Sequence, residues 1–156
     1  MNLQNPYELV DSDNGYTFET EYGQIYSLSF LFYSLISNSK NYRVYTFNLE
    51  PINSVKPVID NRIEITIQFA LKKFFEKKVN ALIVVFDSCD GRHQARARLF
   101  ERWYRNSNVQ NIHKIDATGV IDDTEILTSL FLETSNPYYD EIKASFAELE
   151  NLNFYY

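Results

Sequence analysis

The first third of the chain alternates between apolar and polar positions, which is the period of a β-strand. Residues 16–20 and 42–49 alternate in this way, and residues 24–35 between them predict a longer strand that is apolar on both faces near its middle. Short polar or glycine-containing connections separate them, and such connections join antiparallel neighbours. We therefore predict a three-stranded antiparallel meander at the N-terminal end of the fold.

The stretch that follows fits two periods. The apolar residues of 63–69 alternate strictly, as in a strand, but they also continue along one helical face that begins after Asp60. Asp is a preferred N-cap residue, and no turn residue interrupts the stretch, so we predict a helix over 60–78. This choice places Ile65 and Phe69 on the far face of the helix. Two interpretations of that pair stay open: another element covers it, or it forms a partner surface.

The rest of the chain alternates strands and helices. A continuous apolar run at 81–86 predicts a strand buried on both faces, and the helix at 60–78 suits a crossover between parallel strands. Asn136-Pro137 is a typical helix start. The remaining predicted elements are a helix at 92–105 and strands at 112–118 and 124–133. The sequence thus predicts one α+β domain over 1–156, with a meander followed by α-β-α-β-β-α and a mixed, mostly antiparallel sheet on which the helices pack.

Composition narrows the class of protein. The chain has 156 residues, of which 45% are hydrophobic and one is Cys. That content suits a globular domain, and a single Cys provides no disulfide framework within the chain. No apolar run approaches the length of a membrane span, and the first residues do not resemble a signal peptide. We expect a cytoplasmic protein that does not bind membranes.

Charge is distributed unevenly along the sequence. The net charge is −6, yet the segment 92–105 carries +4, so the rest of the chain carries −10. Within the predicted helix, Arg98, Arg102 and Arg105 fall on the side opposite the apolar residues. These arginines are either a solvated helix face or a contact for phosphates or an acidic partner. Another protein is the expected partner, since an acidic chain with three exposed arginines gives only a weak nucleic-acid signal.

The turn between strand 81–86 and the next helix is where catalysis would occur. Asp87 and Asp90 lie at the end of a buried strand, and two carboxylates suffice to hold Mg²⁺ together with substrate phosphates. His93 would serve as a base or third ligand, and Arg92 or Arg96 would contact a phosphate. The structural interpretation is that Asp90 caps the helix and Asp87 forms an ion pair with Arg96.

The same segment carries a resemblance to a known family. Cys89-Asp90-Gly91-Arg92 is followed by the pattern Arg-x-Arg-x-Phe-x-x-Trp, which ends at Trp103. This stretch resembles a small family of uncharacterised bacterial proteins, described as a domain of unknown function. The resemblance implies no reaction.

Two functions are consistent with the sequence. The first is a non-catalytic macromolecular interaction module with no cofactor, and its candidate binding residues are Arg92, Arg98, Arg102, Arg105, Ile65 and Phe69. The alternative is a metal-dependent phosphodiesterase, such as a toxin-like RNase, with Asp87, Asp90, His93 and Mg²⁺. The aromatic residues of the tail at 152–156 leave a homo-oligomer open as well.

Overall fold

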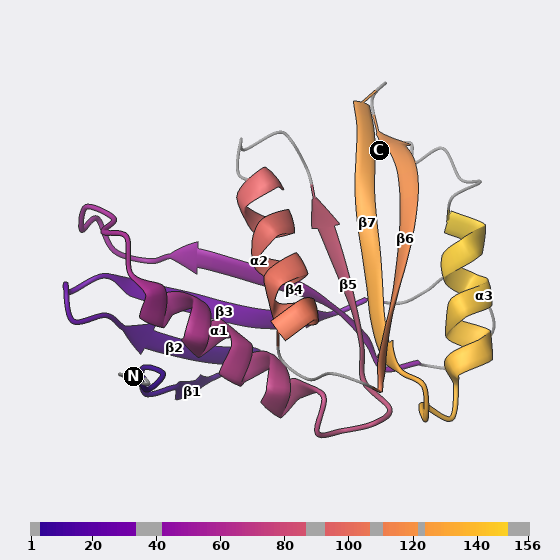
Figure 1. The fold of residues 1–156 in the computed structure, drawn as a ribbon, viewed down its shortest axis with the longest axis horizontal. Coiled ribbons are helices and arrows are strands. Elements are labelled where there is room, and N and C mark those ends of the chain that lie inside the picture. Colours follow the sequence, from indigo (N-terminus) through magenta and orange to yellow (C-terminus); the bar gives the residue numbers. More distant parts are fainter. Residues whose placement is uncertain (1–3, 34–41, 87–92, 107–110, 122–123, 150–156) are drawn as a thin grey trace. The chain divides into compact units, whose positions relative to one another are not determined.

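A computed structural model describes the chain over residues 4–33, 42–86, 93–106, 111–121 and 124–149 (Figure 1). It contains three helices and seven strands within these residues. In chain order they are β1 (Val10–Ser12), β2 (Gly15–Glu19), β3 (Ile25–Phe32), β4 (Val44–Pro51), α1 (Asn61–Phe74), β5 (Ala81–Phe86), α2 (His93–Asn106), β6 (Ile112–Ile121), β7 (Thr124–Glu133) and α3 (Tyr139–Leu149). No helix in the described residues has the length and apolarity required to cross a membrane.

The strands form one sheet in the order β1-β2-β3-β4-β5-β7-β6. β1–β2, β2–β3, β5–β7 and β6–β7 pair antiparallel, and β4 pairs parallel with β5, with Val44 opposite Ala81. The predicted α+β class, the N-terminal strands and the mostly antiparallel sheet are therefore confirmed. The parallel pair joined through α1 is the crossover that the pattern predicted.

The chain forms two compact units. The N-terminal unit comprises residues 1–31 and 47–76, and the C-terminal unit comprises residues 32–46 and 77–156. In the N-terminal unit, Phe18 and Leu28 of the strands and Ile67 and Leu71 of α1 are almost fully buried. The prediction of a single domain over 1–156 stays a prediction.

Helix α1 settles the ambiguity between two periods. The Oδ1 atom of Asp60 accepts a hydrogen bond from the Arg62 N–H at 2.9 Å, so Asp60 is the predicted N-cap. The helix ends at Phe74 rather than at residue 78, because the N–H groups of Phe75 and Glu76 close its last turn onto earlier carbonyls. Amphipathic burial of Ile67 and Leu71 outweighs the β propensity of the isoleucines.

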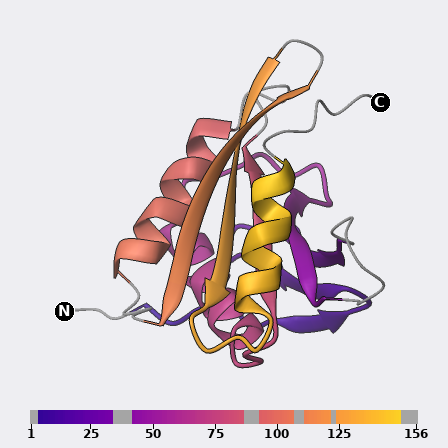
Figure 2. The same ribbon diagram turned by 90° about the vertical axis from the view of Figure 1, so that its right-hand side faces the viewer.

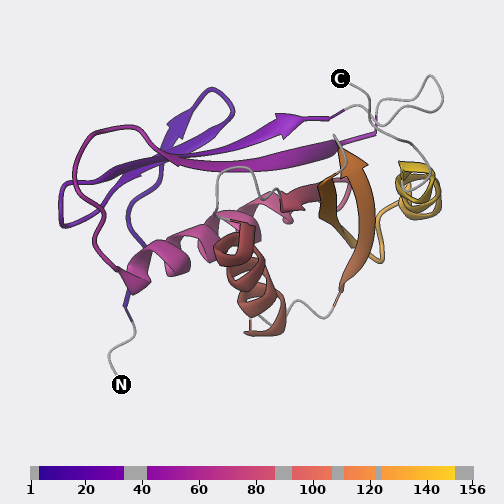
Figure 3. The same ribbon diagram turned by 90° about the horizontal axis from the view of Figure 1, so that it is seen from above.

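In the C-terminal unit, α2 and α3 cover opposite faces of the β5-β7-β6 part of the sheet (Figures 2 and 3). Register explains this division, because alternate residues of a strand point to opposite faces. Leu82 lies opposite Phe131, and Ile83 lies opposite Leu130. The first pair belongs to the face under α2, and the second pair belongs to the core under α3.

Helix α3 is fixed at its start and along its buried face. The side-chain oxygen of Asn136 accepts a hydrogen bond from the Tyr138 N–H at 2.9 Å, as the Asn-Pro signal predicted. Ile142 and Phe146 are then buried in a cluster with Leu130 of β7. The face of the sheet under α3 is therefore apolar, and α3 covers its centre.

Strand ends shift by up to three residues, as in β6, which runs to Ile121 rather than to 118, and two further details of the sheet differ from the prediction. The strand β1 was not predicted, because three exposed residues carry no alternation that a sequence pattern can detect. Strand β5 is not buried throughout, since Val85 is 38% exposed. The parallel pairing with β4 reaches only as far as Ile83, so β4 gives the end of β5 no lateral cover.

Candidate interaction surface

The inner face of α2 is held by an aromatic cluster. Phe100 and Trp103 are each 1% exposed and pack against Phe131 of β7, with ring centroids 5.8 Å and 5.3 Å away. Tyr104 adds a polar tie, because its hydroxyl donates to the carbonyl of Ile112 on β6 at 2.9 Å. Buried aromatic pairs of this kind add to the free energy of burial and restrict the orientation of a helix. These contacts therefore fix the orientation of α2 and, with it, the direction of its outer face.

The outer face of α2 carries three arginines. Arg98, Arg102 and Arg105 are all exposed, as the helical pattern predicted. Their spacing of four and three residues places them along one side of the helix. The Nε atom of Arg105 lies 2.9 Å from Glu101, and the Arg105 side chain is 73% exposed. An ion pair as exposed as this one is weak, so Arg105 can exchange it for another carboxylate.

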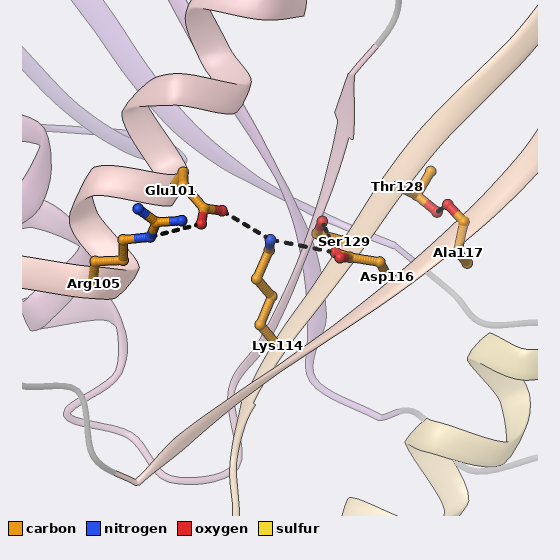
Figure 4. A network of polar contacts seen from close by, with 7 residues as sticks. All are labelled: Glu101, Arg105, Lys114, Asp116, Ala117, Thr128 and Ser129. Atoms are coloured by element: carbon orange, nitrogen blue, oxygen red, sulfur yellow. Dashed lines mark hydrogen bonds and ion pairs between the residues drawn. The ribbon is translucent and has the colours of Figure 1, made fainter.

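Glu101 links this face to the edge strand β6 (Figure 4). The Nζ atom of Lys114 lies 3.1 Å from one Glu101 carboxylate oxygen and 3.6 Å from Asp116. Asp116 in turn accepts a hydrogen bond from the Ser129 hydroxyl at 2.6 Å. The network thus alternates in charge, from Arg105 to Glu101 to Lys114 to Asp116.

The network changes the pKa of one of its residues, Glu101. The hydrogen bond from Lys114, together with its positive charge, lowers the pKa of Glu101 below the ordinary 4.5. Partial burial opposes this shift, and Arg105 reinforces it. Glu101 is therefore ionised at neutral pH and offsets part of the positive charge of the arginine face.

Lys114 and Asp116 were not among the predicted site residues. The signal that could have identified them is their spacing of two residues in strand 112–118, which places both on one face of the sheet. In the charge count, both residues belonged to the part of the chain outside 92–105, which carries −10 in total. Their association with Glu101 depends on the way α2 packs over β6, which sequence spacing does not encode.

A second polar network lies in the N-terminal unit. The Tyr7 N–H donates to the Thr66 hydroxyl at 2.9 Å, and the Tyr7 hydroxyl donates to the Asp60 carboxylate. The guanidinium of Arg62 lies 3.9 Å from the centroid of the Tyr7 ring. Tyr7 is 6% exposed, and burial followed by the hydrogen bond with Asp60 raises its pKa above 10.0. This network ties the N-terminal segment to the start of α1.

The apolar pair on α1 is partly exposed. Ile65 is half-buried, whereas Phe69 is 40% exposed and lies under the Nζ atom of Lys73, which is 5.4 Å from the ring centroid. The Lys73 Nζ atom also lies 5.7 Å from the ring of Tyr16. Whether another element covers this pair or it forms a partner surface stays a prediction.

The predicted catalytic turn lies outside the described part of the chain. Asp87, Asp90 and Arg92 belong to it, and the side chains of His93 and Arg96 are also outside the described set. The Asp87–Arg96 ion pair and the Mg²⁺ alternative therefore stay predictions. Among the residues that the structure does describe, no cluster of three or more His, Cys, Asp or Glu side chains is placed to hold a metal ion.

The second histidine is on the α3 side of β6. His113 is exposed, as predicted, and its Nδ1 atom contacts the hydroxyl of Tyr139. The two rings meet edge to face, with centroids 5.6 Å apart. Its partner is the Tyr139 ring at the start of α3, so His113 packs between β6 and that helix.

The described residues define an α+β protein with a cationic helix face and no recognisable catalytic set among them. The chain belongs to a family of unknown function, DUF6169, whose model matches residues 59–148. The match begins just before α1 and reaches into α3, so it includes the whole of α2. No curated protein and no solved structure matches the chain. The expected membership of an uncharacterised family is thus confirmed, while the shared Cys89–Trp103 pattern stays a prediction.

Proposed function

We propose that this protein is a non-catalytic interaction module that binds an acidic surface of another protein through Arg98, Arg102 and Arg105. One observation supports the proposal above all: these three exposed arginines lie along a helix whose opposite face is buried by aromatic residues. A helix held in this way presents its charges without the entropic cost of ordering a loop.

The choice of partner follows from the chemistry of arginine. A guanidinium forms two parallel hydrogen bonds with a carboxylate, so a row of arginines suits Asp and Glu side chains of a protein. Long polyanions are a poorer match, because the net charge of −6 repels them as a whole. Complementary charge would govern mainly the rate of association and the selection of partners.

The test is capture of partners from the host lysate with two charge-reversed variants. Arg98→Glu/Arg102→Glu changes the proposed surface, and Lys143→Glu on α3 is a single charge reversal at another exposed helix position. We expect specific partners of the wild type to be lost with the first variant and retained with the second. Equal recovery with all three proteins would contradict the proposal. Phe69→Asp, run in parallel, tests whether the α1 surface contributes.

The catalytic alternative predicts an activity, RNA cleavage, that depends on different residues. A phosphodiesterase would cleave RNA in the presence of Mg²⁺ and lose that activity on Asp87→Asn/Asp90→Asn substitution. Cleavage that survives Arg98→Glu/Arg102→Glu but not the paired asparagine variant would favour the alternative over the interaction module.

A further inference from the structure

The outer edge of strand β6 is a candidate surface for pairing with another strand. β6 is the last strand in the sheet order, and it pairs with β7 along ten residues on one side only. In Figure 2 it runs between α2 on the left and α3 on the right. Among the described strands none pairs with this edge. A strand edge of this length exposes backbone N–H and C=O groups that another strand can use.

Register shows which backbone groups face outward. The carbonyl of Asn111 accepts a hydrogen bond from the Thr134 N–H at 2.8 Å, so position 111 faces β7. In an antiparallel ladder the direction alternates with each residue. Positions 112, 114, 116 and 118 therefore direct their N–H and C=O groups away from β7. The bond from Tyr104 to the Ile112 carbonyl agrees with this assignment.

We propose that two copies of this chain associate through β6, antiparallel, with the twofold axis at Ile115. In this register Lys114 of each copy lies opposite Asp116 of the other. Both residues are at outward-facing positions, so each forms a hydrogen-bonded pair with its counterpart across the axis. Opposite charges that face each other across strands stabilise the pairing, and symmetry supplies the contact twice.

Charge selects this register from its neighbours. Moving the axis by one residue, to Asp116, places that carboxylate opposite its own copy, and like charges directly opposite are destabilising. Moving it to Ala117 pairs Asp116 with Thr118 and leaves Lys114 without an acidic counterpart across the axis. Of these three registers, only the one centred on Ile115 matches cations with anions.

The residue at the axis is apolar. Ile115 is half-buried and packs against the core cluster beneath α3. At a twofold axis it would face its own copy as a non-hydrogen-bonded pair, in which side chains approach most closely. The pairing would therefore bury the part of Ile115 that a single copy leaves exposed.

Two features of the edge bear on this pairing. The Ile112 carbonyl already accepts a bond from Tyr104, but a carbonyl oxygen has a second lone pair for a strand partner. A lysine at a sheet edge often prevents association. Here Glu101 and Asp116 of the same copy lie within ion-pair distance of Lys114, so its positive charge is already compensated and does not repel a second copy.

The inference is independent of the proposed function. In antiparallel pairing the axis is perpendicular to the sheet, so equivalent faces of the two copies point in the same direction. The two α2 helices, and with them the two rows of arginines, would lie on one side of a continuous sheet. Formation of the dimer does not depend on any acidic partner.

Sedimentation of the full chain tests the charges. We expect a wild-type dimer, and we expect Asp116→Lys to raise its dissociation constant by about ten- to a hundredfold, because two attractive pairs become repulsive. The exchange Lys114→Asp/Asp116→Lys should recover most of the affinity. Circular dichroism on each variant confirms that it is folded. A monomeric wild type, or a dimer insensitive to Asp116→Lys, would overturn the proposal.

Disulfide trapping tests the register without changing charge on the axis. In a Cys89→Ser background, Ile115→Cys should form a disulfide-linked dimer, because Cα atoms of a non-hydrogen-bonded pair lie about 4.5 Å apart. His113→Cys is the matched control on the same face of β6, and its two copies would be about 13 Å apart, beyond disulfide reach. Equal cross-linking at both positions, or none at Ile115→Cys, would refute this register.

Discussion

Two polar networks, one in each unit of the molecule, differ in what they connect. In the N-terminal unit, Tyr7 reaches across more than fifty residues of sequence to Asp60 and Thr66, and its ring is almost fully buried. In the C-terminal unit, Arg105, Glu101 and Lys114 meet at the surface. Burial makes the first network a structural tie, and exposure leaves the second available to a partner.

The two networks also shift pKa values in opposite directions. Burial raises the pKa of Tyr7, whereas the Lys114 hydrogen bond lowers the pKa of Glu101. Loss of a buried polar partner leaves its counterpart unsatisfied, and loss of an exposed partner allows water to replace it. The comparison therefore predicts a large effect on stability in one unit and a small one in the other.

The largest effect is expected at Asp60. Asp60→Ala removes both the N-cap of α1 and the acceptor of the Tyr7 hydroxyl. We expect the free energy of unfolding to fall by about 2–4 kcal/mol, as the sum of a lost cap and an unsatisfied buried hydroxyl. Urea denaturation measures it, with Asp11→Ala as an exposed carboxylate control in the same unit. A loss no greater than that of the control would remove the distinction between the networks.

The smallest effect is expected at Glu101. Because its folded pKa is lowered, the contribution of Glu101 to stability is present above the ordinary 4.5 and is lost as pH falls through the lowered value. The Glu101 side chain is 41% exposed, so Glu101→Gln should cost only about 0.5 kcal/mol at neutral pH. Urea denaturation of both proteins should show this difference disappearing in acid. A difference that persists at low pH would contradict the assigned cause.

The sequence was most informative where periodicity and capping agreed. Asp60 predicted the start of α1, Asn136 that of α3, and the arginine spacing predicted the exposed face of α2. These are local properties, since caps and helical faces depend on residues within one or two turns.

The features that were missed depend on contacts between distant segments. The bond from Tyr7 to Asp60 needs an N-terminal segment to return to α1, and the contact of Lys114 with Glu101 needs α2 to lie over β6. No spacing rule relates such pairs. Strand β1 was not predicted for a different reason. Its register with β2 comes from the turn between them and not from an apolar pattern.

The central claim is that the arginines of α2 serve binding rather than folding. The most direct test is the free energy of unfolding of Arg98→Glu/Arg102→Glu, measured by urea denaturation beside Lys143→Glu. We expect both variants to stay within about 1 kcal/mol of the wild type, as exposed charge changes usually do. A loss of more than about 2 kcal/mol in the arginine variant alone would show that these side chains hold the fold together, and would contradict the claim.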